Sequence, residues 1–324
     1  MPANISFING QAEAATALTP AWWDVGSANV LPFVPNSEQM IEEAHLDWTV
    51  AKRPIFDHNG DRINGYSVTT REDTGKHLGI VGNRYQVVQN REAFNFLDSL
   101  LMDEILKYES AGALRGGRTI WALARIPSVD EVAEGDTLNR YVLWLNSHDG
   151  CGAIYAIPTS VRVVCSNTAR LAIAGHVGIR HCGNIKDKLK RAHEILSQAD
   201  ERFTLFRDQG RLLASTTANA TQTSEYLRTL FPEPEESGRG RTNWQRKLAE
   251  ITKTQDNDRQ NLPSIKGTWW SLYNAVSEAI DHGDIFRFRG GDDARNENRM
   301  LSVMTGNGAD LKSRAFDLAV AMAG

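Results

Sequence analysis

The chain has 324 residues, of which 41% are hydrophobic and 23% are charged, an ordinary composition for a globular protein. It carries 36 basic and 40 acidic side chains, a formal net charge of −4, which excludes a strongly basic nucleic-acid coat but allows a local basic groove. Three cysteines without a C-x-x-C pair argue against a disulfide scaffold, and no apolar run reaches the roughly 18 residues of a membrane span.

Residues 1–36 are predicted to form an extended acidic arm. The first 51 residues contain six carboxylates and no Lys or Arg. The first twenty residues have neither a basic leader nor an apolar run, so we expect no secretory signal and a cytoplasmic protein. Adjacent Trp22 and Trp23 indicate that the arm is pinned to a surface, either of its own domain or of a neighbouring subunit.

An α+β core domain is expected over residues 37–230, with antiparallel β-hairpins backed by helices. Residues 37–88 predict a short helix capped by Ser37 and then strands joined by Asn-Gly and Thr-Gly turns. A longer helix is predicted over residues 90–108, because Asn90 is a good cap and apolar residues recur behind it at helical spacing.

The second half of the core combines strands with the longest predicted helix. Hairpins are expected to turn at Gly116–Gly117 and Asp149–Gly150, and a short helix is expected to start near Ser166. Over residues 184–213 apolar side chains recur every 3.5 residues, which predicts one long helix. Its apolar face is expected to pack on the domain's own sheet or to form a helix–helix seam, within the chain or between subunits. The periodic residues are Ile185, Leu189, Ala192, Leu196, Ala199, Phe203 and Phe206.

Residues 231–324 predict a helical C-terminal region with flexible linkers. The linkers are the Pro- and Gly-containing charged stretch at 231–243 and the polar stretch at 255–264, and a mobile loop is expected over 281–299. Helices are predicted at 244–254, 268–281 and 309–322.

The sequence contains no established motif for catalysis or for a cofactor, so no catalytic residue, cofactor or structural metal is assigned. The turn SHDGCG at 147–152 collects hydroxyl, imidazole, carboxylate and thiol groups, but neighbours on a tight turn diverge in space. The nearest zinc candidates do not show paired ligand spacing. They are Cys165, His176, His181 and Cys182. These patterns favour a binding protein and keep an enzyme as an alternative.

Two basic patches are candidates for nucleic-acid binding, and a plain solvated surface is the alternative for each. Residues 140–229 hold 12 basic and seven acidic side chains. One patch flanks the Gly-Gly turn, and the other runs from a strand into the start of the long helix. Cations for phosphates with rings for stacking are the parts of a single-strand groove. The candidate residues are Arg115, Arg118, Trp121, Trp144, Arg162, Arg180, Lys186 and Lys190.

An ordered set of segments along the chain resembles a known family. They include LDWTVAKRPIF, GIVGNRYQVVQNREAFNFLD, LNSHDGCGAIYAIPTSVRVVCSNT and GTWWSLYNAVSEAIDHG. The chain is similar to the phage/plasmid-like protein family, a domain-of-unknown-function group of bacteriophages and other mobile elements. Members often carry a segment similar to AWHGLG near the N-terminus, whereas this chain has Trp23 and Asp24 there. A function that relied on the His of that segment is therefore not implied for this chain.

The resemblance implies a mobile-element protein in the host cytoplasm and brings no catalytic residues. We expect a phage nucleic-acid-binding protein that binds or anneals single-stranded DNA in recombination or replication, as a homo-oligomer such as a ring. The alternatives are a counter-defence or structural phage protein with a host protein partner, and an enzyme that processes nucleotides or nucleic acid.

Overall fold

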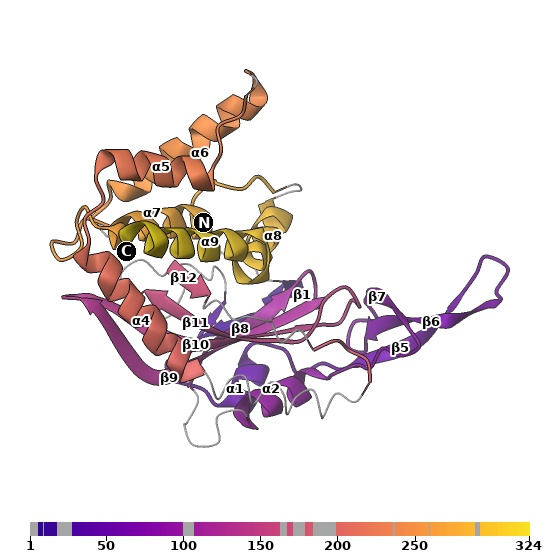
Figure 1. Cartoon of the computed structure of the whole chain (residues 1–324). Helices are drawn as coiled ribbons and strands as arrows, with labels where there is room; N and C mark the ends of the chain where they lie inside the picture. The colour runs from indigo at the N-terminus through magenta and orange to yellow at the C-terminus, as the bar shows by residue number, and fades with distance from the viewer. Residues whose placement is uncertain are drawn as a thin grey trace.

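A computed structural model of the chain shows a seven-stranded sheet with helices on both faces (Figure 1). The structure describes residues 6–8, 10–17, 28–99, 107–162, 167–170, 179–183, 199–235, 237–258, 260–288 and 292–324. The strands of this main sheet lie in the order β12-β11-β10-β9-β8-β3-β4, and all neighbours are antiparallel except β3 and β4. Their bounds are β3 (Ala14–Thr16), β4 (Asn29–Val30), β8 (Lys107–Leu114), β9 (Thr119–Ala133), β10 (Asp136–Ser147), β11 (Tyr155–Arg162) and β12 (Asn167–Arg170).

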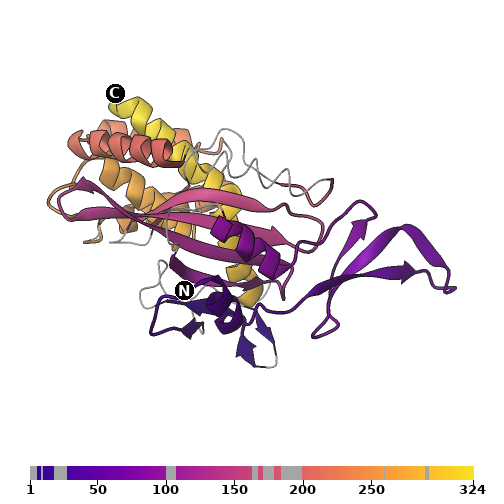
Figure 2. The ribbon, with the colours of Figure 1, turned by 90° about the horizontal axis from the view of Figure 1, so that it is seen from below.

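A second sheet of three antiparallel strands projects from one end of the main sheet, and we call it the wing (Figure 2). It comprises β5 (Val50–Phe56), β6 (Arg62–Arg71) and β7 (His77–Gly82). Its base is fixed to the main sheet, because the Thr69 hydroxyl donates to the carbonyl of His148 at 2.7 Å. A separate small hairpin pairs β1 (Phe7–Ile8) with β2 (Gln11–Ala12).

Helices cover the main sheet from two sides, and on the second side further helices pack on the first helical layer (Figure 1). On the first side lie α1 (Ser37–Glu43) and α2 (Asn90–Ser99). The other helices are α4 (Ala199–Ser215), α5 (Ala220–Leu230), α6 (Arg239–Gln255), α7 (Trp269–Asp281), α8 (Asp292–Thr305) and α9 (Asn307–Ala323). Every residue of α7 is buried, since it lies at the centre of this group, and Thr268 caps its first turn. One hydrophobic cluster runs from Ala15 to Ala319, so the described core is continuous across residue 230.

The α+β class with antiparallel hairpins is confirmed, and both expected turns are present at Gly116–Gly117 and Asp149–Gly150. The helix predicted over 268–281 is also confirmed, within one residue at its start. In the predicted long helix, residues 184–198 lie outside the described part. Its last turns form α4, where Phe203 and Phe206 are buried against the chain's own core.

Several local predictions were wrong, because tertiary pairing overrides local signals. Residues 107–108, expected to end a helix, begin β8, and residues 167–170, expected to begin one, form β12. Helix α6 begins inside the stretch expected to be a linker, and α8 begins inside the expected mobile loop. The first helix is capped by Asn36 rather than Ser37, through a capping box with Gln39.

The described part of the predicted extended arm packs on its own domain. Residues 14–16 form a strand of the main sheet, hydrogen-bonded between β8 and β4. Glu13 beside it is buried and forms a 2.7 Å ion pair with Arg71 of the wing. Small residues such as Ala14 and Ala15 carry little strand signal, which is why the sequence pattern did not reveal β3. Trp22 and Trp23 lie outside the described residues.

Candidate functional site

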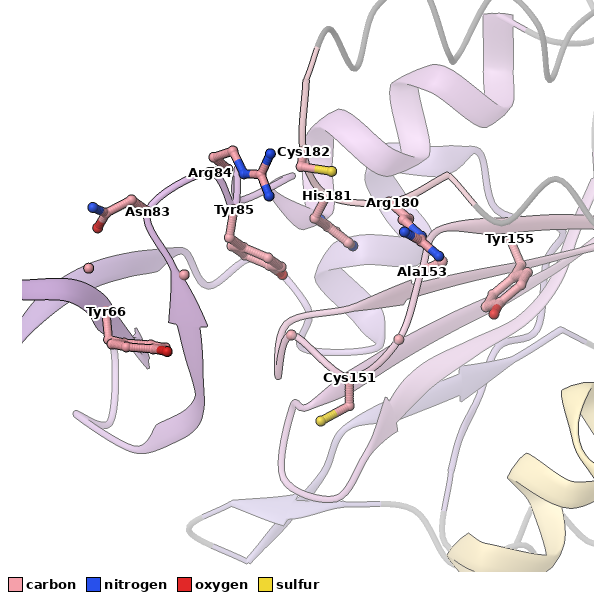
Figure 3. Close-up of a pocket in the computed structure, with 14 residues that line it drawn as sticks. Tyr66, Asn83, Arg84, Tyr85, Cys151, Ala153, Tyr155, Arg180, His181 and Cys182 are labelled. Carbon is pink, nitrogen blue, oxygen red and sulfur yellow. The ribbon is translucent and has the colours of Figure 1, made fainter.

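A cavity of about 700 Å³ opens between the wing and the β10–β11 turn (Figure 3). Its walls are residues 82–85 after β7, residues 150–153 of the turn, and residues 180–182, with Tyr66 and Tyr155 at its edges. Segments distant in sequence meet here because Tyr85 bridges to Cys182, and Ile154 bridges to Ile179. The long-range pairing, rather than any local motif, therefore builds the site.

The charge on this cavity is positive. Arg84 and Arg180 line it and are both exposed, and neither forms an ion pair with another described residue. Among the described lining residues there is no Asp or Glu. Behind the wall, the ammonium group of Lys52 donates to the carbonyls of Asn83 and Tyr85 and adds a third positive charge. An anion placed here would meet these cations, while the nearest carboxylate, Asp149, lies behind the lining residues and accepts hydrogen bonds within its own turn.

The β10–β11 turn adds backbone donors to the same wall. Asp149 shapes the turn, because its carboxylate accepts from the Ser147 hydroxyl at 2.6 Å and from the Cys151 amide at 2.8 Å. Gly150 adopts a φ of 77°, which allows the chain to reverse. In the described structure the amides of Gly152 and Ala153 donate to no other protein group. Successive free amides on a tight turn form an anion-binding concavity.

Aromatic rings line the cavity beside these donors (Figure 3). The rings of Tyr85 and His181 stack with centroids 4.8 Å apart, and the Tyr85 hydroxyl donates to the carbonyl of Ser147. Nδ1 of His181 donates to the carbonyl of Gln86, and burial lowers the pKa of this imidazole. Tyr66 is 55% exposed and leaves a ring face free at the edge.

The candidate catalytic cluster of the turn does not assemble. His148 is fully buried, and its Nε2 donates a hydrogen bond to Asn90 Oδ1 at 2.8 Å. The Ser147 hydroxyl donates instead to the Asp149 carboxylate, so the imidazole takes no part in that hydrogen bond. Burial lowers the pKa of His148 to about 3, so its imidazole is neutral near pH 7. The His148 side chain therefore supports the turn from inside the core and does not activate the Ser147 hydroxyl.

A second cavity of about 470 Å³ lies on the other side of the same turn. Cys151, Gly152, Ala153 and Tyr155 line both cavities. Its far wall is the β8–β9 turn with Arg115 and the side of α8 with Asn298. The two cavities therefore share one wall, formed by these four residues.

The structure brings two of the predicted binding residues to these cavities. Arg180 lines the first and Arg115 the second, whereas Arg118 is exposed beside the β8–β9 turn and lines neither. The Arg162 side chain, Lys186 and Lys190 lie outside what the structure describes.

The two tryptophans proposed for base stacking are corrected. Trp121 is 1% exposed and Trp144 0%, in two different hydrophobic clusters of the main sheet. A nucleobase cannot reach either ring in this structure. The residues that sequence reasoning missed are Arg84, Tyr66 and Tyr155, and the only local signal for them was a cation in the turn GNRY at 82–85.

The described residues contain no group of three or more His, Cys, Asp or Glu side chains placed to hold a metal ion. Two of the zinc candidates, Cys165 and His176, lie outside the described residues. Among the described helices none is both long enough and apolar enough to cross a membrane.

A family model described as "Domain of unknown function (DUF932)" matches residues 77–303. The match extends from β7 to α8 and so includes most of the residues around both cavities. No curated protein and no solved structure matches the chain.

Proposed function

The chain belongs to the family described as a domain of unknown function (DUF932), and from the geometry of the site we propose that it binds single-stranded nucleic acid in the first cavity. The observation that carries the proposal is the pair of arginines without ion-pair partners, Arg84 and Arg180, beside two free backbone amides. Both arginines line a cavity whose described walls include no carboxylate, and the two amides belong to residues of the same lining. A phosphate group matches this arrangement in charge and in hydrogen-bonding capacity.

The rings around the cavity favour a single strand over a duplex. Tyr66 on β6 is exposed at one edge of the cavity, and Tyr155 on β11 is half-buried at the other, with the two arginines between them (Figure 3). Bases are free to stack on protein rings only where they are unpaired, and alternation of cations with rings is the general plan of single-strand grooves. Because the chain as a whole carries −4, binding depends on this local surface.

Stacking is tested by Tyr66→Ala, assayed by fluorescence anisotropy with a labelled oligothymidylate and with a duplex of equal length. Loss of the ring is expected to cost about 1–3 kcal/mol of binding free energy without changing the dependence of log K on log salt. The control is Ile80→Ala, which removes another exposed apolar side chain of the wing outside the cavity. Equal binding of duplex and single strand by the parent, or parental affinity in Tyr66→Ala, would contradict the single-strand assignment.

The resemblance to phage/plasmid-like proteins supports the biological setting that we propose. In that setting the protein is a cytoplasmic homo-oligomer that binds or anneals single-stranded DNA during recombination or replication of a mobile element. The described part of the heptad seam is buried within its own chain, so subunit contacts would use other surfaces. Light scattering with and without an oligonucleotide measures the assembly, and a monomer in both conditions would contradict it.

A second candidate function is a protein-binding counter-defence or structural protein. The observation that favours it is the wing, where Phe56 is 56% and Ile80 66% exposed. A protein partner that covered the wing would bury these apolar side chains. Such a protein would bind its partner without a salt-sensitive affinity for oligonucleotides.

A further inference from the structure

The tip of the β8–β9 hairpin is attached to α8 across the second cavity. Arg115, at this tip, has a φ of 54°, which is uncommon for a residue with a side chain. Its backbone amide donates to Glu297 Oε1 at 2.8 Å, and its guanidinium donates to Asn298 Oδ1 at 2.5 Å. Next to it, the amide of Gly116 donates to the Ser6 hydroxyl. Backbone contacts therefore hold the tip in place, independently of the guanidinium.

The partner of the Arg115 guanidinium is a neutral amide. Asn298 accepts a hydrogen bond from the guanidinium without neutralising it, and no described carboxylate forms an ion pair with that group, since the nearby Glu297 carboxylate binds the backbone amide of Arg115 instead. A phosphate group carries a full negative charge and can accept two parallel N–H bonds from a guanidinium, whereas Asn298 Oδ1 is neutral and accepts one, so a phosphate is the stronger partner for Arg115. The one described carboxylate that lines this cavity, Asp149, already accepts two hydrogen bonds within its turn.

We propose that the second cavity is a further phosphate subsite, in which Arg115 binds the strand and Asn298 is the positioning residue that holds Arg115 in place until the strand arrives. The inference rests on the proposed function and extends it. Because the two cavities share the wall formed by Cys151, Gly152, Ala153 and Tyr155, a strand that follows this wall would reach both Arg180 and Arg115. The ligand class is therefore a polynucleotide strand long enough to occupy both cavities, in preference to a free nucleotide.

Strand length separates the two subsites in a binding experiment. The probes are oligothymidylates of about three and about 12 nucleotides, the longer one within the usual site size of a single-strand groove. Arg115→Ala is expected to bind the longer strand roughly tenfold more weakly and the shorter strand like the parent. Arg180→Ala is expected to weaken both strands, because it belongs to the first cavity.

The role of Asn298 is tested by two substitutions. Asn298→Asp keeps the shape and places a carboxylate against the guanidinium, so it is expected to lower affinity for the longer strand about as much as Arg115→Ala. Asn298→Ala frees Arg115 and is expected to bind that strand at least as tightly as the parent. Urea unfolding of each variant separates these effects from loss of fold.

The outcomes distinguish this inference from the proposed function. Parental binding of the longer strand by Asn298→Asp, or equal weakening of both strands by Arg115→Ala, would overturn the second subsite and leave the first cavity intact. If Arg180→Ala has no effect on either strand, the proposed function itself is wrong.

Discussion

At the scale of single residues, burial decides which side chains are available for chemistry. Trp121 and Trp144 are the aromatic residues that the sequence pattern selected, yet both lie in the core, and Tyr66 is the ring that remains exposed. Alternation along a strand predicts which residues share a face, but not which face is covered by a helix. The sequence analysis selected Arg180 and Arg115, which the structure places at the two cavities, but it offered no basis for choosing among the rings.

His148 provides a residue-scale prediction for stability. Its folded-state pKa is about 3, whereas an imidazole in the unfolded chain titrates near 6.5. Below about pH 6.5 the imidazole takes up a proton in the unfolded chain but not in the folded one, which favours unfolding. The contribution of neutral, buried His148 to the free energy of unfolding is therefore complete above about pH 6.5. It is lost as the pH falls towards 3, by about 1.4 kcal/mol per pH unit. Urea unfolding between about pH 7.5 and about pH 5 should show this slope, and His148→Gln should reduce it.

The matched control for His148 is His58, which is exposed in the β5–β6 turn. His58→Gln should keep the parental dependence of unfolding free energy on pH. Burial also lowers the pKa of His181, so the free energy of unfolding of the His148 variant is expected to keep part of its dependence on pH. Identical slopes for the parent and His148→Gln would contradict the buried, neutral assignment of His148.

At the scale of elements, the site depends on how closely the wing approaches the β10–β11 turn. A Cβ atom added at Gly79 of β7 would lie 2.2 Å from the carbonyl oxygen of Asp149, which is closer than any real contact. Gly79→Ala is therefore expected to separate the two elements and to lower the free energy of unfolding by about 1–3 kcal/mol. Gly82→Ala, in the same strand with open space around it, should unfold like the parent. Equal stability of both variants would show that this contact is not tight.

Elements with strong local signals were predictable, and elements defined by distant pairing were not. The periodic Phe203 and Phe206 predicted helix α4, and the cap Thr268 with its apolar run predicted α7. In contrast, β3 and β12 are recognisable only from their pairing with β8 and β11. The residues of β3 are mostly small, and β12 begins with residue types that are typical of a helix N-cap. The cavity has the same character, because it joins three segments between Gly82 and Cys182.

At the scale of the whole molecule, the fold places a local cationic surface on an acidic protein. The chain carries −4, yet Arg84 and Arg180 meet in one cavity with free backbone amides and without a carboxylate among its described walls. We propose that this cavity binds the phosphates of a single strand. Such binding releases counterions, so its strength must depend on salt.

The most direct measurement is the affinity for an oligothymidylate at several salt concentrations, for the parent, for the double variant Arg84→Ala/Arg180→Ala, and for Arg62→Ala. Each phosphate contact contributes about 0.7 to the slope of log K against log salt, so the double variant should bind more weakly with a slope flatter by about 1.4. Arg62 is exposed on the wing outside both cavities and should leave affinity and slope near parental values. A parent that does not bind at low salt, or a double variant with the parental slope, would contradict the account.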